Sequence, residues 1–315
     1  MQTAKNILYG DKSNLQPWGL IILLLSKCAR ANQRIQNKTI EENQRVLAEL
    51  TEMIRTGHLI HKGVVNVPFA KRSKDTESAI FGNKIAILLG DYLLVTANGM
   101  LAGLKNQDLS YIISSALRDL SEGEFFGERD EQNMPLPGKP KRNIANDVYD
   151  LNFDTTCLEI EDVLGNPRRE WTVRAVFNGA SLLGRGCQGV MLLSKQSREM
   201  QNYAYHFGCH LGLAWQAATE LQQLTSDSKE QFSLASAPVL YALEENPELY
   251  KVIEQAKGDV KDVDYEDMKF NILKTDAVEK TQALYDDHAE QATKFVESIG
   301  QNESTDMIKK LINTY

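Results

Sequence analysis

Apolar residues recur every three or four positions along most of the chain, the spacing that places them on one face of an α-helix. The sequence lacks the sustained apolar and polar alternation, rich in β-branched residues, that a half-buried strand requires. The pattern therefore predicts an all-α protein. The helices that it predicts begin at residue 39 and cover 81–104, 107–123, 169–193 and 198–224, with amphipathic helices in the charged tail beyond residue 238.

Two of these predicted helices have unusual compositions. The segment 81–104 carries Ile85, Leu88, Leu89, Tyr92 and Leu93 along one apolar side. The segment 169–193 is rich in glycine, which lowers helix stability but lets neighbouring helices approach closely, so we expect close helix packing there. Its glycines are Gly179, Gly184, Gly186 and Gly189.

The region from residue 124 to residue 170 breaks the helical period. It contains the Pro, Gly and Lys-rich stretch MPLPGKPKRN between acidic segments. We therefore predict a loop-rich insertion at about 124–170 within a single helical domain that spans residues 1–315. The most apolar run, 19–25, is far shorter than the roughly 20 residues of a membrane span, so we predict a core helix there and no transmembrane segment.

Composition and charge narrow the possible functions. Hydrophobic residues make up 42% of the chain and charged residues 25%, which is typical of soluble domains with a substantial core. The 35 basic and 43 acidic residues give a net charge of −8, which argues against a nucleic-acid-binding surface. The N-terminus shows no convincing targeting presequence. The four cysteines are widely spaced, so we expect reduced and mostly buried thiols: Cys28, Cys157, Cys187 and Cys209.

Sequence motifs of several common enzyme classes, GxSxG, GxxxxGK[ST] and HExxH, are absent. His206 and His210 are four residues apart and could place two metal ligands on one helix face, but no other paired donors accompany them. We therefore favour buried structural histidines. The acidic groups at 262–267 and 286–287 lack, respectively, the glycine of a calcium loop and a facing acidic partner, and we interpret both as solvated surface.

The segment 59–94, LIHKGVVNVPFAKRSKDTESAIFGNKIAILLGDYLL, resembles the first signature region of the all-trans polyprenyl diphosphate synthases. In active members of that family an Asp-Asp-x-x-Asp motif follows the leucine, aliphatic residue and histidine. Here Lys62, Gly63 and Asn66 occupy the three aspartate positions, while the flanking residues keep their register. These three residues are called the first motif positions below.

The segment 206–224, HFGCHLGLAWQAATELQQL, resembles the helix that carries the second aspartate motif of the same family. Thr219, Glu220 and Gln223 stand at its aspartate positions and are called the second motif positions below. The family likeness covers about 15–243 and is weakest across the insertion.

Three further parts of the family pattern are altered as well. Lys71 and Arg72 stand where active members have two arginines, and the resemblance implies that they could bind diphosphate. Asn178 and Gly179 occupy the positions of a lysine and a threonine, so the phosphate-binding lysine is lost. Near the N-terminus, Gln16 stands where the family has an arginine.

The resemblance implies an isoprenoid-synthase-type helical bundle without its usual chemistry. Active members hold Mg²⁺ between two opposed carboxylate clusters, and these ions neutralise the departing pyrophosphate. With six aspartates replaced, the resemblance implies no catalytic residue and no metal ligand on this chain, and Mg²⁺ in a catalytic partner subunit instead. The altered motifs are most similar to those of the non-catalytic second subunits of decaprenyl and related long-chain polyprenyl diphosphate synthases. That similarity implies a heterotetramer that makes the ubiquinone side chain in mitochondria.

Two alternative functions stay open. The chain could retain weak prenyltransferase activity through Lys62, Lys71, Arg72 and Glu220, with lysine acting as a point charge in place of a metal bridge. It could also bind isoprenoid diphosphates without reacting. For Lys71 and Arg72 a solvated basic pair explains the sequence as well as diphosphate binding does.

Overall fold

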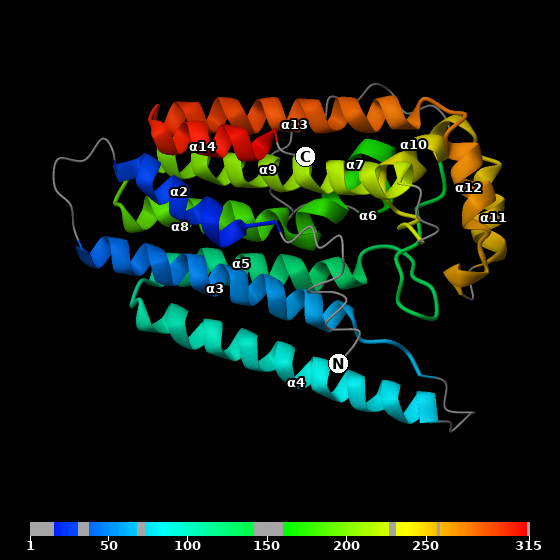
Figure 1. The fold of residues 1–315 in the computed structure, drawn as a ribbon, viewed down its shortest axis with the longest axis horizontal. Helices are drawn as coiled ribbons and strands as arrows, with labels where there is room; N and C mark the ends of the chain where they lie inside the picture. The colour runs from blue at the N-terminus through cyan, green and yellow to red at the C-terminus, as the bar shows by residue number, and fades with distance from the viewer. Residues whose placement is uncertain are drawn as a thin grey trace. The chain divides into compact units, whose positions relative to one another are not determined.

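The computed structural model describes residues 16–30, 38–67, 74–141, 160–226, 231–256 and 259–313. Within these ranges the chain is helical (Figure 1), and the prediction of an all-α protein is confirmed. The described residues group into two compact units. The first unit comprises 1–120, 182–209 and 291–314, and the second comprises 121–181 and 210–290. The single domain expected for residues 1–315 stays a prediction.

Helices of the first unit pack side by side around an apolar core. Their bounds are α2 (Trp18–Arg30), α3 (Lys38–Lys62), α4 (Lys74–Gly103), α5 (Gln107–Glu122), α8 (Ser181–Leu193) and α14 (Glu303–Ile312), joined by the first part of α9 (Arg198–Thr225) and the last part of α13 (Ala277–Ile299). Helix α3 contacts both α2 and α4, and α14 contacts α2. The Gln44 amide of α3 donates to Ser194 Oγ at 2.7 Å and to the Val190 carbonyl at 3.3 Å, which ties α3 to α8.

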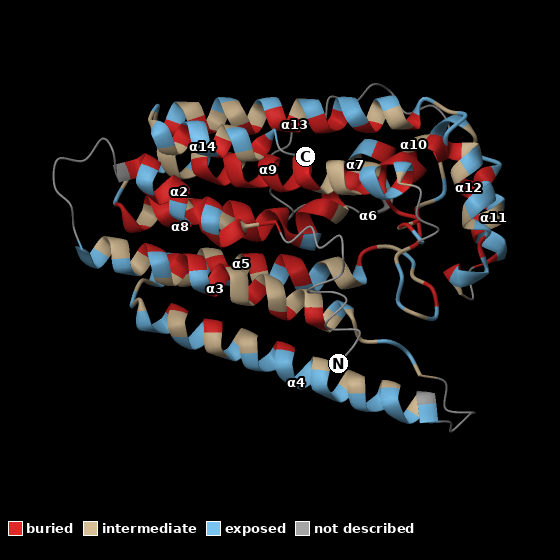
Figure 2. Ribbon diagram, in the orientation of Figure 1, coloured by how far each residue is buried: buried red, intermediate tan, exposed pale blue. Residues whose placement is uncertain are grey.

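Burial differs sharply among these helices. Figure 2 shows α8 largely buried and α4 mostly exposed or half-buried. The apolar run 19–25 lies in α2, where Ile21, Ile22 and Leu25 are fully buried, so the predicted core helix is confirmed. The cysteines Cys28, Cys187 and Cys209 are free and buried as predicted, whereas Cys157 lies outside the described residues.

The glycines of α8 allow the close packing that the sequence predicts. A Cβ on Gly184 would lie 2.5 Å from Cys209 Sγ, and one on Gly186 would lie 2.8 Å from Ile22 Cδ1. Across the α8–α9 contact, a Cβ on Gly208 would lie 2.7 Å from Gly184 Cα and 2.8 Å from the Leu183 carbonyl oxygen. The two backbones therefore touch at a place where only glycine fits.

The second unit is built from shorter elements. Their bounds are η1 (Gly123–Phe125), α6 (Ile160–Val163), α7 (Pro167–Ala175), η3 (Val176–Ala180), α10 (Ala237–Glu245), α11 (Leu249–Gln255), η4 (Val260–Asp262) and α12 (Tyr265–Ile272), joined by the last part of α9 and the first part of α13. Helix α10 contacts α7, α11 and α12. Residues 126–141 have no helix, and 142–159 lie outside the described residues, so only the two ends of the predicted insertion are seen.

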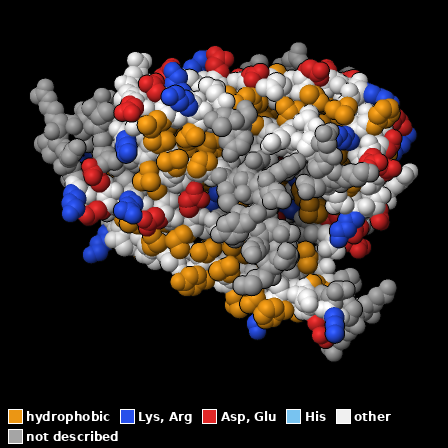
Figure 3. Space-filling view, viewed as in Figure 1, with side chains coloured by type: hydrophobic (Ala, Val, Ile, Leu, Met, Phe, Trp, Pro, Cys, Tyr) orange, Lys and Arg blue, Asp and Glu red, His pale blue; other side chains and the backbone are white. Residues whose placement is uncertain are grey.

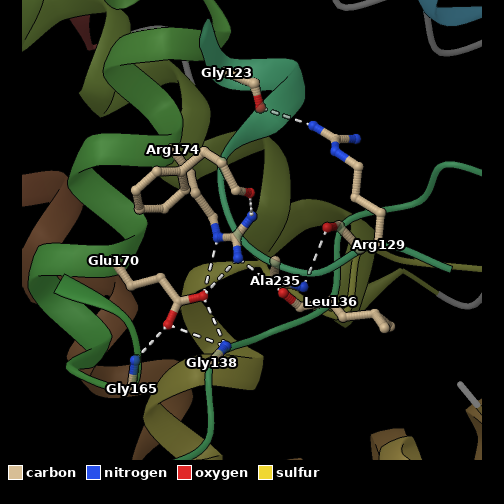
Figure 4. Close-up of polar contacts among 10 residues, drawn as sticks. Gly123, Arg129, Leu136, Gly138, Gly165, Glu170, Arg174 and Ala235 are labelled. Carbon is tan, nitrogen blue, oxygen red and sulfur yellow. Dashed lines mark hydrogen bonds and ion pairs between the residues drawn. The ribbon is translucent and has the colours of Figure 1, made fainter. Parts of the chain in front are cut away.

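A buried ion pair on α7 holds the described ends of this insertion in place (Figure 4). Arg174 and Glu170 are 2.8 Å apart, and the Glu170 carboxylate also accepts from the backbone N–H groups of Gly138 at 2.9 Å and Gly165 at 2.8 Å. Arg174 in turn donates to the Leu136 carbonyl at 2.8 Å. One charged pair therefore satisfies backbone groups from both sides of the insertion.

The α8–α9 contact generates a stability prediction. Gly208→Ala should lower the free energy of unfolding by about 1–3 kcal/mol, because its Cβ meets backbone atoms that cannot rotate away. Gly82→Ala is the matched control: a Cβ at Gly82 meets nothing within 4 Å, and alanine should stabilise α4 by up to about 1 kcal/mol. Chemical denaturation followed by circular dichroism measures both. Equal effects of the two substitutions would contradict the inferred backbone contact.

Candidate functional site

The first motif positions lie where α3 ends. Lys62 is the last residue of the helix and is exposed, and the Gly63 N–H donates to the Ile60 carbonyl at 3.1 Å to close the final turn. Asn66 follows in a non-helical segment and is also exposed. The C-terminal end of a helix carries partial negative charge, so a lysine stabilises this position whereas aspartates there would repel it.

The segment after α3 is fixed by the start of α4. The Asn83 side chain accepts from the Val65 N–H at 3.1 Å and donates to the Val65 carbonyl at 2.7 Å. His61 Nε2 lies 3.2 Å from the Ile87 carbonyl oxygen and 3.4 Å from an Asp91 carboxylate oxygen. The flanks of the first motif thus keep a defined geometry, while Lys71 and Arg72 lie outside the described residues.

Positive charge dominates the last turns of α3. The pKa of His58 is lowered to about 3, chiefly by burial and to a smaller extent by the nearby charges of Lys62 and Arg55. His58 is therefore neutral near pH 7. A cluster of this sign can attract an anion but offers no carboxylate to a metal ion.

The second motif positions lie on α9, in the second unit, and have three different environments. The Thr219 hydroxyl donates to the Trp215 carbonyl of its own helix at 2.8 Å. Gln223 is exposed. Glu220 is buried. The two sets of motif positions belong to different units.

The buried Glu220 carboxylate is surrounded by three nitrogen donors. Trp171 Nε1 of α7 and the backbone N–H of Ala237 each donate to Oε2 at 2.8 Å, and Gln216 Nε2 donates to Oε1 at 2.7 Å. Ala237 is the first residue of α10, so the carboxylate lies at the positive end of that helix. Glu220 therefore caps α10 and joins it to α7 and α9 within the second unit.

Protonation of Glu220 is shifted by this environment. Burial raises the pKa of Glu220 to about 7, while the hydrogen bonds from Gln216, Ala237 and Trp171 act in the opposite direction. Burial disfavours the charged carboxylate more strongly than the three donors favour it. The group is a half-protonated structural acid near neutral pH.

The residues at the motif positions do not fit Mg²⁺. This ion requires near-octahedral oxygen ligands, usually with carboxylates among them. Lysine has no acceptor when charged and glycine has no side-chain ligand, which leaves Asn66 as the single amide among the first motif positions. Among the second, the Glu220 oxygens already accept from Trp171, Ala237 and Gln216. No step of a prenyl-transfer reaction can therefore be derived through a metal on these residues.

The remaining positions taken from the family pattern also lack phosphate-binding chemistry. Asn178 is exposed, and Gly179 next to it adopts φ 150°, a left-handed conformation that favours glycine, within the distorted segment η3. Gln16 is buried and accepts from Trp18 Nε1 at 3.0 Å and Arg55 Nη1 at 3.2 Å. Gln16 thus acts as a structural acceptor where the family has an arginine.

Two buried histidines form a pair that the sequence only partly predicts. His210 Nδ1 lies 2.9 Å from His288 Nδ1, so one ring donates and the other accepts, and both side chains are buried. The His288 ring also stacks on Trp171, and burial lowers its pKa to about 3. His210 is buried as predicted, whereas His206 is half-buried and stacks on Phe295. His288, which is 78 residues away, gave no sequence signal, and the described residues hold no group of three or more potential metal ligands.

The acidic segments of the tail are explained by local structure. The Asp264 side chain accepts from the backbone N–H groups of Glu266 and Asp267 and caps α12. Asp287 pairs with Arg168 at 2.6 Å, with both side chains about half exposed. The interpretation of both segments as surface rather than metal sites agrees with these contacts.

Comparison with known proteins identifies the family. The family model for polyprenyl synthetase matches residues 19–137. A prenyl transferase of Cyanophora paradoxa is 30% identical over 313 residues, which cover 96% of this chain and 85% of that relative. The chain belongs to the polyprenyl synthetase family.

Further similarities lie within the same family. The mouse all-trans polyprenyl-diphosphate synthase PDSS2 is 34% identical over 255 residues, which cover 76% of this chain and 56% of that protein. The chain thus spans little more than half the length of this relative. The structure of an Arabidopsis medium/long-chain length prenyl pyrophosphate synthase in its apo form shares the fold, with a TM-score of 0.63, 23% identity, and coverage of 94% of this chain and 85% of that one. The expected isoprenoid-synthase-type bundle is confirmed.

The environment of Glu220 in this polyprenyl synthetase homologue generates a pH prediction. Its pKa is about 7 in the folded chain against 4.5 as the ordinary value, so the folded state binds the proton more tightly. The stability that Glu220 contributes is therefore fully present below pH 4.5 and is lost as the pH rises through 7. Glu220→Gln cannot titrate, and its stability relative to the wild type should rise by on the order of 2–3 kcal/mol between pH 4.5 and pH 8.

The measurement is denaturant unfolding followed by tryptophan fluorescence at both pH values. Glu220→Ala is the second variant. It cannot titrate either, so its stability relative to the wild type should change with pH as that of Glu220→Gln does. It also leaves the N–H groups of Trp171 and Ala237 without their acceptor, so it should be less stable than Glu220→Gln by about 1–3 kcal/mol per donor at both pH values. Glu244→Gln, at a half-exposed site in the second unit, is the control. Its stability relative to the wild type should be the same at both pH values. If wild type and Glu220→Gln kept a constant difference across this range, the carboxyl would not titrate as described.

Proposed function

We propose that this chain is a non-catalytic subunit of a heteromeric all-trans long-chain polyprenyl diphosphate synthase. Its catalytic partner, a homologous chain, binds Mg²⁺ and joins allylic diphosphate with isopentenyl diphosphate to make the ubiquinone side chain in mitochondria. This chain stabilises the partner or shapes the tunnel that sets product length. The pathway, the mitochondrial location and the heterotetramer rest on family resemblance.

The buried carboxylate of Glu220 is the observation that carries this proposal. It is the single acidic residue among the six motif positions, and it accepts from Trp171, Gln216 and Ala237 rather than facing solvent. A carboxylate has about four acceptor sites, and three of them here accept from protein donors, so Glu220 cannot act as a bidentate ligand of a metal ion. Each charge-stabilising group lost from a transition state costs a few kcal/mol, so the chain alone should be slower than an active member by several powers of ten.

The similarity to PDSS2 supports the choice of a synthase subunit over an unrelated binding protein. The helices and their register follow the family, so a partner of the same fold can meet this chain through paired helices in a near-symmetric interface. The preserved fold would allow this chain to assemble with a partner, and the altered motif positions would prevent it from catalysing the reaction itself.

Co-expression with the catalytic homologue from the same source tests the proposal. The two chains should co-purify, and the complex should show higher soluble yield and either faster turnover or an altered product length relative to the homologue alone. Replacing the aspartates of the homologue should abolish turnover, because the chemistry belongs to that chain. Glu220→Gln in this chain should leave turnover of the complex unchanged. Unchanged solubility, assembly and product length on co-expression would rule the role out.

The purified chain alone should show no turnover above background with allylic diphosphate, isopentenyl diphosphate and Mg²⁺. Radiolabelled isopentenyl diphosphate and extraction of the products provide the measurement. Turnover that disappeared in Lys62→Ala and in Lys71→Ala with Arg72→Ala would establish the alternative of a weak prenyltransferase. Calorimetry with an unreactive allylic diphosphate analogue tests the other alternative. If the chain binds diphosphates, the wild type should give a heat of binding, and Lys62→Ala and the Lys71→Ala, Arg72→Ala double variant should give none.

A further inference from the structure

The elements α10, α11, η4 and α12 form a segment with an apolar core largely of its own. Most buried side chains of the core cluster to which these elements belong come from the segment itself, Val239, Ile253 and Met268 among them. Figure 3 shows charged side chains over α11 and α12, which can be located in Figure 1, so their outer face is solvated. A segment with its own core can open as a cooperative unit. We call residues 237–256 and 259–272 the α10–α12 segment.

Two buried carboxylates attach this segment to the rest of the second unit. Glu220 Oε2 of α9 accepts from the N–H of Ala237, the first residue of α10, at 2.8 Å. Asp130 Oδ2 accepts from the N–H of Val260, the first residue of η4, at 2.9 Å. The N–H groups at the start of a helix have no partner within the helix. Both attachments therefore depend on acceptors that lie outside the segment.

The two attachments differ in the company that each carboxylate keeps. Asp130 also accepts from the N–H groups of Gln132 and Met134, so it is fixed within its own hairpin. Glu220 accepts from Trp171, Gln216 and Ala237, which are all neutral donors. Neutral donors compensate only in part for the water that a buried charge has lost. Ionised Glu220 thus gains hydration if the segment opens.

The other titratable groups around Glu220 do not supply the missing positive charge. His288 of α13 stacks on Trp171 and bonds to His210 of α9, and burial lowers the pKa of His288 to about 3. On α10, burial raises the pKa of Tyr241 to about 12. The charged groups on α7, α10 and α13 are paired with one another: Glu170 with Arg174, Arg168 with Asp287, and Glu244 with Lys280.

The ionisation of Glu220 is therefore linked to whether the segment is closed. The pKa of Glu220 is about 7 when the carboxyl is buried, and its ordinary value, 4.5, applies when water surrounds it. The closed state binds the proton more tightly, so the stability that it gains from this group is fully present below pH 4.5 and is lost as the pH rises through 7. Opening should increase with pH over this range and level off above it.

We propose that the α10–α12 segment is a lid over Glu220 that opens when this residue loses its proton to water. In the closed state Oε2 accepts from Trp171 and Ala237, so the proton of the neutral acid lies on Oε1 and Gln216 accepts it after its amide turns over. Ionisation brings water to the carboxylate, and the bond to Ala237 breaks. Helices α11 and α12 follow α10 because they share its core.

This device goes beyond the proposed function, because it is a property of the chain alone. It requires neither the catalytic homologue nor a diphosphate. Opening of the segment is measured on the purified chain, whereas the subunit role is measured by co-expression. Each proposal can therefore fail while the other stands.

Hydrogen exchange of the full chain tests the proposal, with mass spectrometry at pH 6, 8 and 9 and correction for the intrinsic exchange rate. Protection of the amides of α10 and α12 should be about tenfold lower at pH 8 than at pH 6 and should change little from pH 8 to pH 9. These amides should also exchange faster than those of α8 and depend less steeply on urea, because the segment opens before the whole chain unfolds.

Two variants separate the titration from the attachment itself. Glu220→Gln is neutral at every pH, so protection of the segment should be the same at pH 6 and pH 8. Asp130→Asn is the matched control, because it weakens the other attachment. It should lower protection of the segment at both pH values and leave the tenfold difference between them in place.

Three results would overturn the proposal. The first is equal protection of α10 at pH 6 and pH 8 in the wild type. The second is a pH difference that persists in Glu220→Gln, which would assign it to another group such as His210. The third is exchange of α10 and α8 at the same rate and with the same urea dependence, which would mean that the segment opens only by global unfolding. The wild type alone decides the first and third if the variants fold poorly.

Discussion

Three N–H groups converge on the buried carboxylate of Glu220, and this interaction determines what the second unit can do. It joins α7, α9 and α10 through Trp171, Gln216 and Ala237. Removing the carboxylate would leave buried donors unpaired, so the position has a structural reason to stay acidic. The same contacts direct both oxygens into the protein. By its position in the family motif, Glu220 looks like a remnant of a metal site. In the structure it caps α10.

Much of the fold is predictable from the residues because helix period and motif register are local properties. The bounds of α5 and α9 differ from the predicted ones by a residue, and the close α8–α9 contact follows from glycine spacing. The role of Glu220 was not predictable in this way. Its partners Trp171 and Ala237 are 49 and 17 residues away, and only the Gln216 contact, four residues earlier on the same helix, had a visible sequence signal. The same limit applies to His288, whose partner His210 is 78 residues away.

Helix α4 shows a different limit of sequence reasoning. Periodicity identifies the apolar side of this helix, but it does not show whether that side is buried in the core of the chain or exposed on its surface. The direction is decided by α3, because Gly57 and Gly90 bring the two helices into contact on the opposite side. The larger side chains, Phe81 and Tyr92 among them, are then left in solvent.

The motif positions and the exposed apolar side of α4 differ in how well they suit the isolated chain. Lys62 complements the negative end of α3, and Glu220 lies at the positive end of α10, although burial still disfavours its charged form and raises its pKa to about 7. The exposed apolar side of α4 is unfavourable in water, because Leu88 and Val95 lose the free energy of burial there and such a surface promotes aggregation until something covers it. In this chain the motif positions have structural roles, and the least favourable surface is an apolar helix face. Both features suit a protein that functions by binding another chain.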